Sequence, residues 1–210
     1  MNFLAHCLIG DRAAREDRDA LVAGGFLGDF VKGPLPPAMP DDLSLGVRLH
    51  RRVDAYSNQH PIIRDSVARF PTELRRIAPI LVDILCDHFL SSHWDEFHPT
   101  SLPRFTRKVY VDVASFEPWL PGAGHRFLTY ARERDLLARY ADWTVALGAM
   151  RSITRRLGLG ELDAGMEAAV PPLLGDLDED FRAYFPDIVD HACAWADEAR
   201  RSGGQDSARS

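Results

Sequence analysis

Apolar residues recur along the chain at intervals of three and four, which is the spacing of one face of a helix. Near the end of the chain, Phe181, Phe185, Ile188, Ala192 and Trp195 would form a single stripe facing a core. No segment shows the sustained alternation of apolar and polar residues that a half-buried strand requires. The pattern therefore predicts an all-α protein, built as a single-domain helical bundle.

The same pattern places the expected elements. We expect helices at roughly residues 2–9, 19–31, 43–56, 60–70, 73–93, 103–116, 123–140, 142–157, 163–174 and 177–200. Segments rich in proline and glycine, at residues 33–37 and 118–124, separate some of these helices. A chain of 210 residues that is 46% hydrophobic suits one domain, over residues 1–201. The Ser- and Gly-rich residues 202–210 are predicted to form a disordered tail.

Composition narrows the classes of function. The cysteines, Cys7, Cys86 and Cys193, are odd in number and far apart, so we expect no disulfide framework and a reducing, cytoplasmic location. The apolar N-terminus lacks a basic leader and a cleavage site, and the apolar stretch at 77–90 is too short to span a bilayer, so no membrane segment is expected. A net charge of -6 argues against nucleic acid as the partner.

Positive charge is concentrated between residues 48 and 76, where seven arginines stand against three acidic residues. Such a patch could steer an acidic partner or hold a phosphate group. Helix faces that carry solvated arginines explain the same charges equally well. No phosphate-binding glycine loop and no serine-nucleophile motif occurs in the sequence, so nucleoside triphosphate and serine-hydrolase chemistry are not supported.

The segment 78–90 carries the first candidate ligands. It is apolar on nearly every side of the helix that it implies, so this helix should be central and buried. It nevertheless contains Asp83, Asp87 and His88, and buried carboxylates are costly unless they are paired, hydrogen-bonded or bound to a metal. Asp83 and Asp87 are four residues apart and share a face, whereas His88 points about 100° away from its neighbour.

Further histidines and aspartates lie in other predicted helices. His50 and Asp54 are one turn apart, and His6 and Asp29 stand in apolar surroundings, with glycines beside Asp29 that would let a backbone or ligand approach. Singly, each has an ordinary explanation, such as a satisfied core histidine for His6. Together they are too many polar groups for a core without a function. Nitrogen and oxygen ligands without cysteine indicate Mn2+, Mg2+, Fe2+ or Zn2+, which usually activate water for hydrolysis.

Several short motifs also occur in a fixed order. They are Met1-Asn2-Phe3-Leu4-Ala5-His6, Gly28-Asp29-Phe30-Val31-Lys32-Gly33, His50-Arg51-Arg52-Val53-Asp54, and Arg75-Arg76-Ile77-Ala78-Pro79 followed by Asp83 and Asp87-His88-Phe89-Leu90-Ser91-Ser92-His93-Trp94. In this order they resemble the acyl carrier protein phosphodiesterase family. The resemblance is close over the first half of the chain, and residues 97–127 match nothing that we can place.

The resemblance implies a fold and a reaction. The fold would be similar to the HD-domain phosphohydrolases, and the reaction would remove 4'-phosphopantetheine from holo acyl carrier protein with a divalent metal, Mn2+ being the first choice. It implies that Asp29 binds metal or takes part in catalysis. The remaining matched positions are His50, Asp54, Asp83, Asp87 and His88, with His6 as an addition; Asp29, His50, Asp87 and His88 are the expected catalytic residues.

Substrate contacts are expected from Arg51, Arg52, Arg75 and Arg76, because a guanidinium group binds phosphate through two parallel hydrogen bonds, and from His93. Two alternatives stay open. An HD-like phosphohydrolase acting on a nucleotide or another small phosphoester would use the same metal site. A non-catalytic helical binding module would pair its buried polar groups with one another and hold no metal.

Overall fold

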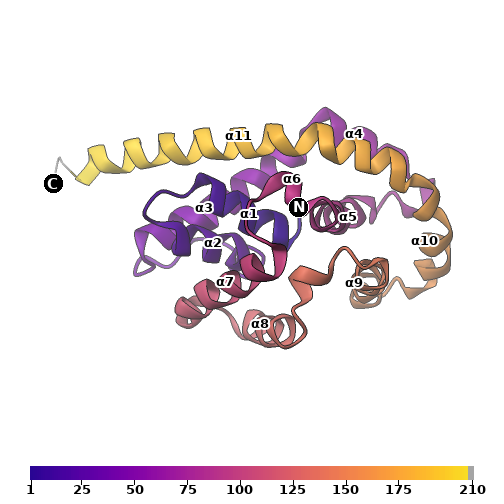
Figure 1. Ribbon diagram of the computed structural model, residues 1–210, viewed down its shortest axis with the longest axis horizontal. Coiled ribbons are helices and arrows are strands. Elements are labelled where there is room, and N and C mark those ends of the chain that lie inside the picture. Colours follow the sequence, from indigo (N-terminus) through magenta and orange to yellow (C-terminus); the bar gives the residue numbers. More distant parts are fainter. Residues whose placement is uncertain (208–210) are drawn as a thin grey trace.

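The computed structural model describes residues 1–202 in full and the backbone of residues 203–207 (Figure 1). The described residues form eleven α-helices and five short 3-10 turns, and they contain no strand. The predicted all-α bundle is therefore confirmed. None of the described helices has the length and apolar content needed to cross a membrane, and the three cysteines are free.

The α-helices are α1 (Phe3–Ala13), α2 (Arg18–Leu27), α3 (Asp41–Ser57), α4 (Pro61–Ala68), α5 (Ala78–Ser92), α6 (Trp94–Phe97), α7 (Leu102–Ser115), α8 (Gly122–Arg134), α9 (Trp143–Arg156), α10 (Asp163–Ala169) and α11 (Leu174–Ser207). The 3-10 turns are η1 (Thr72–Leu74), η2 (Glu117–Trp119), η3 (Leu136–Arg139), η4 (Gly160–Leu162) and η5 (Pro171–Leu173).

Several predicted helices are shorter in the structure, among them those expected at 19–31 and 163–174, and two others show the physical reason. The helix expected at 73–93 is divided into η1 and α5, and Pro79 occupies the first turn of α5, where its missing N–H needs no partner. The helix expected at 123–140 ends as α8 at Arg134. Asp135 adopts a left-handed conformation with φ 46°, which stops the α-helix before η3.

The end of the chain also differs from the prediction. Helix α11 continues to Ser207, so residues 202–207 of the predicted disordered tail are helical, and residues 208–210 lie outside the described residues. Figure 1 shows α11 running along one side of the molecule, where it packs against α1, α3, α4 and α5. The apolar stripe that begins with Phe181 and Phe185 faces the core as predicted, because these rings are almost fully buried.

Glycines on α2 allow α1 and α3 to approach it closely. A β-carbon added at Gly25 would lie 2.7 Å from the backbone oxygen of His6 in α1. One added at Gly24 would lie 2.5 Å from the Cα atom of Gly46 in α3. Side chains do not fit at such distances unless the helices move apart. These glycines therefore set the separation of α1 and α3, the helices that carry His6 and His50.

Asp87 of α5 holds the start of α1. Its buried carboxylate accepts hydrogen bonds from the N–H groups of Leu4 at 2.8 Å and Ala5 at 2.9 Å. The first N–H groups of a helix have no partner within the helix, and Asn2, the N-cap residue, provides no side-chain hydrogen bond. Burial raises the pKa of Asp87 to about 7, although the two N–H groups oppose this rise. This carboxylate is therefore satisfied without a metal.

We predict that Gly25→Ala lowers the free energy of unfolding by about 1–3 kcal/mol, because the added methyl group must push α1 away from α2. Urea denaturation measures the change. Gly148 in α9 is the matched control, since a β-carbon there meets no atom within 4 Å. Gly148→Ala should stabilise the protein by about 0.5–1 kcal/mol. A Gly25→Ala variant as stable as the wild type would show that this contact does not limit the packing.

We also predict that Asp87→Asn lowers the free energy of unfolding by about 1–3 kcal/mol, because an amide has one acceptor oxygen and leaves an N–H group of α1 buried without a partner. Asp65→Asn is the control, since Asp65 is exposed on α4 and its side chain forms no hydrogen bond or ion pair in the part of the chain that the structure describes. Its effect should stay within about 0.5 kcal/mol. Equal stability of the two variants would contradict the role of Asp87.

Candidate metal site

Two imidazoles and one carboxylate meet between α1 and α3. The Nε2 atom of His6 lies 3.1 Å from one oxygen of Asp54, and the Nε2 atom of His50 lies 3.2 Å from the other. The two imidazole rings are stacked with their centroids 3.8 Å apart. One potential ligand atom from each residue lies within 4.8 Å of the others, and no other group of this kind occurs among residues 1–202. His6, His50 and Asp54 are therefore the candidate metal site.

The ring of His50 is held from behind by α2. Its Nδ1 atom lies 2.9 Å from the carbonyl oxygen of Gly25. Because a carbonyl only accepts, Nδ1 carries the proton and Nε2 presents a lone pair toward Asp54. A side chain at Gly28 would overlap the same ring, so the absence of one gives the imidazole its space. Metal-binding histidines commonly use their second nitrogen in this way.

His6 has an unsatisfied nitrogen. The side chain is buried, and its Nε2 atom has no hydrogen-bond partner, although an oxygen of Asp54 is only 3.1 Å away. Burial and the neighbouring His50 lower the pKa of His6 to about 3, so the ring is neutral at pH 7. In the tautomer that carries the proton on Nδ1, the buried lone pair of Nε2 faces this carboxylate, which is unfavourable by itself. A divalent cation between the two would satisfy both, and a nitrogen and oxygen donor set suits such an ion.

Asp54 supplies the negative charge of the site. Burial opposes its ionisation, but the contacts with His50 and His6 outweigh burial and hold the pKa of Asp54 well below its usual value. The side chain of Asp54 is 42% exposed, so the site opens to solvent on this side. An ionised carboxylate beside two imidazole groups attracts a cation.

Asp83 of α5 borders the site. The amino group of Met1 lies 2.8 Å from a carboxylate oxygen of Asp83 and 3.6 Å from one of Asp54. Burial lowers the pKa of this amino group, but the two carboxylates outweigh burial and raise it to about 11. A positive charge thus already lies where the carboxylates of α3 and α5 converge.

Asp29 follows α2 and lies beside the site. Burial raises the pKa of its carboxyl group, while His50 and the Met1 amino group oppose the rise. Its carboxylate forms no hydrogen bond or ion pair within the described residues. Because the preceding Gly28 is in contact with the ring of His50, this carboxylate is held close to the cluster and has no other partner.

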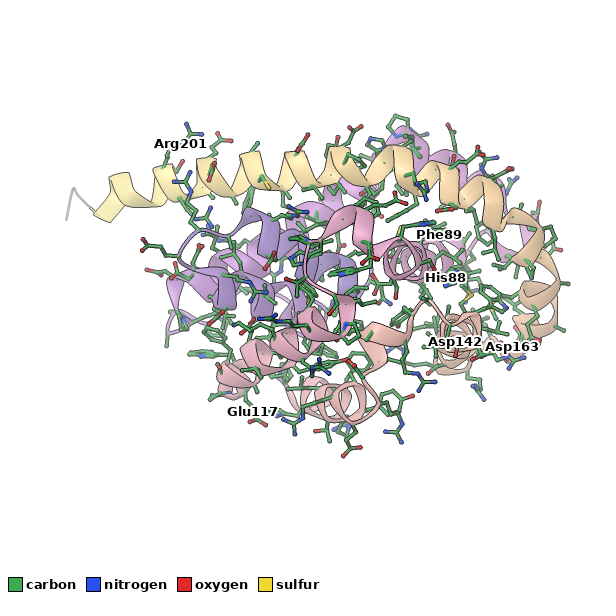
Figure 2. The ribbon with its side chains drawn as sticks, in the orientation of Figure 1. His88, Phe89, Glu117, Asp142, Asp163 and Arg201 are labelled. Atoms are coloured by element: carbon green, nitrogen blue, oxygen red, sulfur yellow. The ribbon has the colours of Figure 1, made fainter. Side chains whose placement is uncertain are left out.

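Asp87 and His88 do not join the cluster. The oxygens of Asp87 are bound to the first turn of α1. The Nδ1 atom of His88 is 2.7 Å from the carbonyl oxygen of Tyr140, and its ring packs edge-on against Trp143 of α9. Figure 2 shows His88 on the side of α5 that faces α9. The assignment of both residues as ligands remains a prediction without a supporting contact.

The predicted substrate-binding arginines are directed to different places. Arg51 donates to the carbonyl oxygen of Val31 at 2.9 Å and so ties α3 to the segment that follows Asp29. Arg52 reaches His191 of α11 instead, at 3.1 Å. Arg75 lies near the carbonyl oxygen of Phe70, and Arg76 is exposed. Of the four, Arg51 is anchored nearest to the cluster.

His93 lies at the far end of α5, about 15 Å from Asp83 along a helix that rises about 1.5 Å per residue. Its Nε2 atom is 2.9 Å from Asp178, and its Nδ1 atom accepts from Arg182 at 2.9 Å. Both partners belong to α11. His93 therefore joins α5 to α11, and its predicted contact with substrate gains no support from these neighbours.

Sequence reasoning missed two groups of the site, the carbonyl oxygen of Gly25 and the amino group of Met1. Both are main-chain groups, so no particular residue type indicates them in the sequence. The glycines beside Asp29 were the one available signal, because they indicate a close approach.

Known proteins that are similar to this chain share one family name. Residues 1–188 match the sequence model of a family described as acyl carrier protein phosphodiesterase. A protein of that name from Photorhabdus laumondii is 30% identical over 91% of this chain and 95% of its own length. Another from Enterobacter is 36% identical over 68% of this chain and 72% of its own length. No solved structure matches the chain. The chain therefore belongs to the acyl carrier protein phosphodiesterase family, a family of phosphodiester hydrolases.

Proposed function

We propose that this enzyme hydrolyses holo acyl carrier protein to apo acyl carrier protein and 4'-phosphopantetheine, with a divalent cation at His6, His50 and Asp54. The family membership supports the reaction. The unpaired Nε2 atom of His6, buried and facing Asp54, supports the metal. The relation to the HD-domain phosphohydrolases, which also hold metal with histidines and aspartates in helical folds, belongs to the same proposal.

Two imidazoles and a carboxylate fit Mn2+, our first choice, as well as Fe2+ and Zn2+, and they fit Mg2+ less well because Mg2+ prefers oxygen ligands. Asp83 borders the three residues and would add a further ligand. A bound cation would polarise the phosphoryl group and favour deprotonation of the attacking water. The cation would also compensate for the charge of the carboxylates.

The residues of the chain would divide the remaining work. Gly25 fixes the tautomer of His50, and Asp54 stays ionised between the two imidazoles. Asp29 would take the proton of the attacking water, because its carboxylate has no other partner and burial raises its pKa. Water oxygen would then bond to phosphorus, the bond from phosphorus to the carrier serine oxygen would break, and that oxygen would receive a proton. Arg51 would neutralise charge on the phosphoryl oxygens.

We predict that incubation with Mn2+ and holo acyl carrier protein removes the mass of 4'-phosphopantetheine from the carrier, because the carrier serine ester is the bond that the site would cleave. Intact-mass spectrometry of the carrier measures this, and a chelator should prevent it. An unchanged carrier with metal bound to the enzyme would favour a nucleotide or another small phosphoester as the substrate. Absence of bound metal would contradict the proposed cofactor.

We predict that Asp54→Asn reduces hydrolysis at least about 100-fold, because it removes the negative charge that the site offers to a cation. Metal content and turnover are measured on the same preparation, with unfolding monitored to show that the variant is folded. Asp65→Asn, which removes the same charge from the exposed face of α4, should keep both metal and turnover. Full metal content in Asp54→Asn would place the ion elsewhere.

A further inference from the structure

A groove of about 700 Å3 lies between α7 and the end of α8, away from the residues of the candidate metal site. Its lining is formed by Arg107, Tyr110, Val111, Ala114, Ser115, Arg132 and Asp135. The floor is fixed by hydrogen bonds, since the hydroxyl of Tyr110 accepts from the N–H group of Leu137 at 3.0 Å, and Thr106 donates to Asp135 at 2.9 Å. A wall held in this way is organised before any partner binds.

Two arginines line the groove, Arg107 and Arg132, and two more, Arg104 and Arg126, lie on the same two helices. Arg104, Arg107, Arg126 and Arg132 are exposed, and their side chains form no ion pair or hydrogen bond with the described residues. From Leu102 to Arg139 the chain carries seven basic residues against four acidic ones, although the whole protein has a net charge of -6. Unpaired guanidinium groups of this kind are available to an acidic surface.

Exposed apolar side chains accompany these arginines. Val111 on α7 is 62% exposed and lines the groove, and Tyr130 on α8 is 47% exposed. They are two of the three large hydrophobic residues that are exposed among residues 1–202. Apolar side chains surrounded by a charged rim are typical of surfaces that bind proteins.

The opposite charge lies on the other side of the molecule. Helix α11 carries nine acidic residues against three basic ones. Figure 1 shows α11 along the top of the view and α7 and α8 at the bottom. This polarity would turn an acidic partner away from α11 and toward the groove. Four of the seven arginines at 48–76 are less available to a partner: Arg69 is paired with Asp176 and Asp180 of α11, and Arg51, Arg52 and Arg75 are bound to other groups of the protein.

Helix α8 connects the groove with the helix that carries His6. Phe127 of α8 stacks on Phe3 of α1 with ring centroids 4.4 Å apart, and Phe3 lies three residues before His6 on the same side of that helix. The bond to be cleaved would join phosphorus to a serine on the carrier surface, so the carrier itself must lie against the enzyme beside the site.

We propose that the groove between α7 and α8 is the surface on which the protein substrate docks, through an acidic surface of the carrier protein. This inference rests on the proposed function, and it names the surface that would bring the carrier serine to the site. Arg107 and Arg132 would pair with carboxylates of the carrier, and Val111 would be covered by the complex.

The test is the double variant Arg107→Glu/Arg132→Glu, measured with holo acyl carrier protein and Mn2+. The KM for the carrier should rise about 10-fold or more while kcat stays unchanged, because the variant repels the partner and leaves the metal site intact. A higher salt concentration should raise the KM of the wild type for the carrier and should change the KM of the variant less. The matched control is Arg155→Glu/Arg156→Glu, which makes the same change of charge on two exposed arginines at the end of α9 that form no ion pair with the described residues, and it should leave KM within about 2-fold.

An unchanged KM in Arg107→Glu/Arg132→Glu, or an equal rise in the control, would overturn the proposal. If the wild type does not hydrolyse holo carrier, the proposed function fails. Binding of fluorescently labelled apo carrier then tests the docking surface independently of hydrolysis. Loss of binding in Arg107→Glu/Arg132→Glu alone would support the groove as the docking surface. No binding of the carrier by the wild type, or binding of a short DNA duplex in its place, would overturn it.

Discussion

The close packing of α1, α2 and α3 is the constraint on which the rest of this structure depends. Helix α2 lies between the other two, and its glycines remove the side chains that would otherwise hold them apart. As a result the ring of His6 stacks on that of His50, and both nitrogens reach the carboxylate of Asp54. The carbonyl oxygen exposed at Gly25 then fixes the tautomer of His50. Packing and chemistry thus depend on the same few glycines.

Helix α5 shows how a buried helix can carry several polar residues at once. Asp83 faces the site and the amino group of Met1, Asp87 satisfies two N–H groups of α1, and His88 binds the carbonyl oxygen of Tyr140. Each polar group has a partner, so none leaves an uncompensated desolvation cost. The position of α1, and with it that of His6, depends on α5 through Asp87. A residue remote from the metal cluster can therefore influence it through helix position alone.

The distribution of charge separates two regions of the molecule. The candidate metal site is a small, mostly buried cluster whose carboxylates attract a cation. The groove between α7 and α8 is open, basic and partly apolar, while α11 is acidic. A protein substrate needs both a reacting bond at the cluster and a broad area of contact beside it. The contact between Phe127 and Phe3 joins the two regions through a single helix.

The sequence by itself determined the helical fold, because amphipathic periodicity is a local property that each segment shows alone. It also determined that His6, Asp29, His50, Asp54 and Asp83 are unusual, since polar groups in apolar helices need partners.

Only the tertiary structure decided which partners they have. Asp83 and Asp87 share one face of α5, yet Asp83 borders the cluster and Asp87 holds α1. The spacing of two residues along one helix does not reveal which neighbouring helix each of them meets. The end of α8 at Asp135 likewise depends on Thr106, a residue of another helix that donates to its carboxylate. The groove itself is formed by residues of α7 and α8 that no local sequence pattern brings together. Only the tertiary structure shows it.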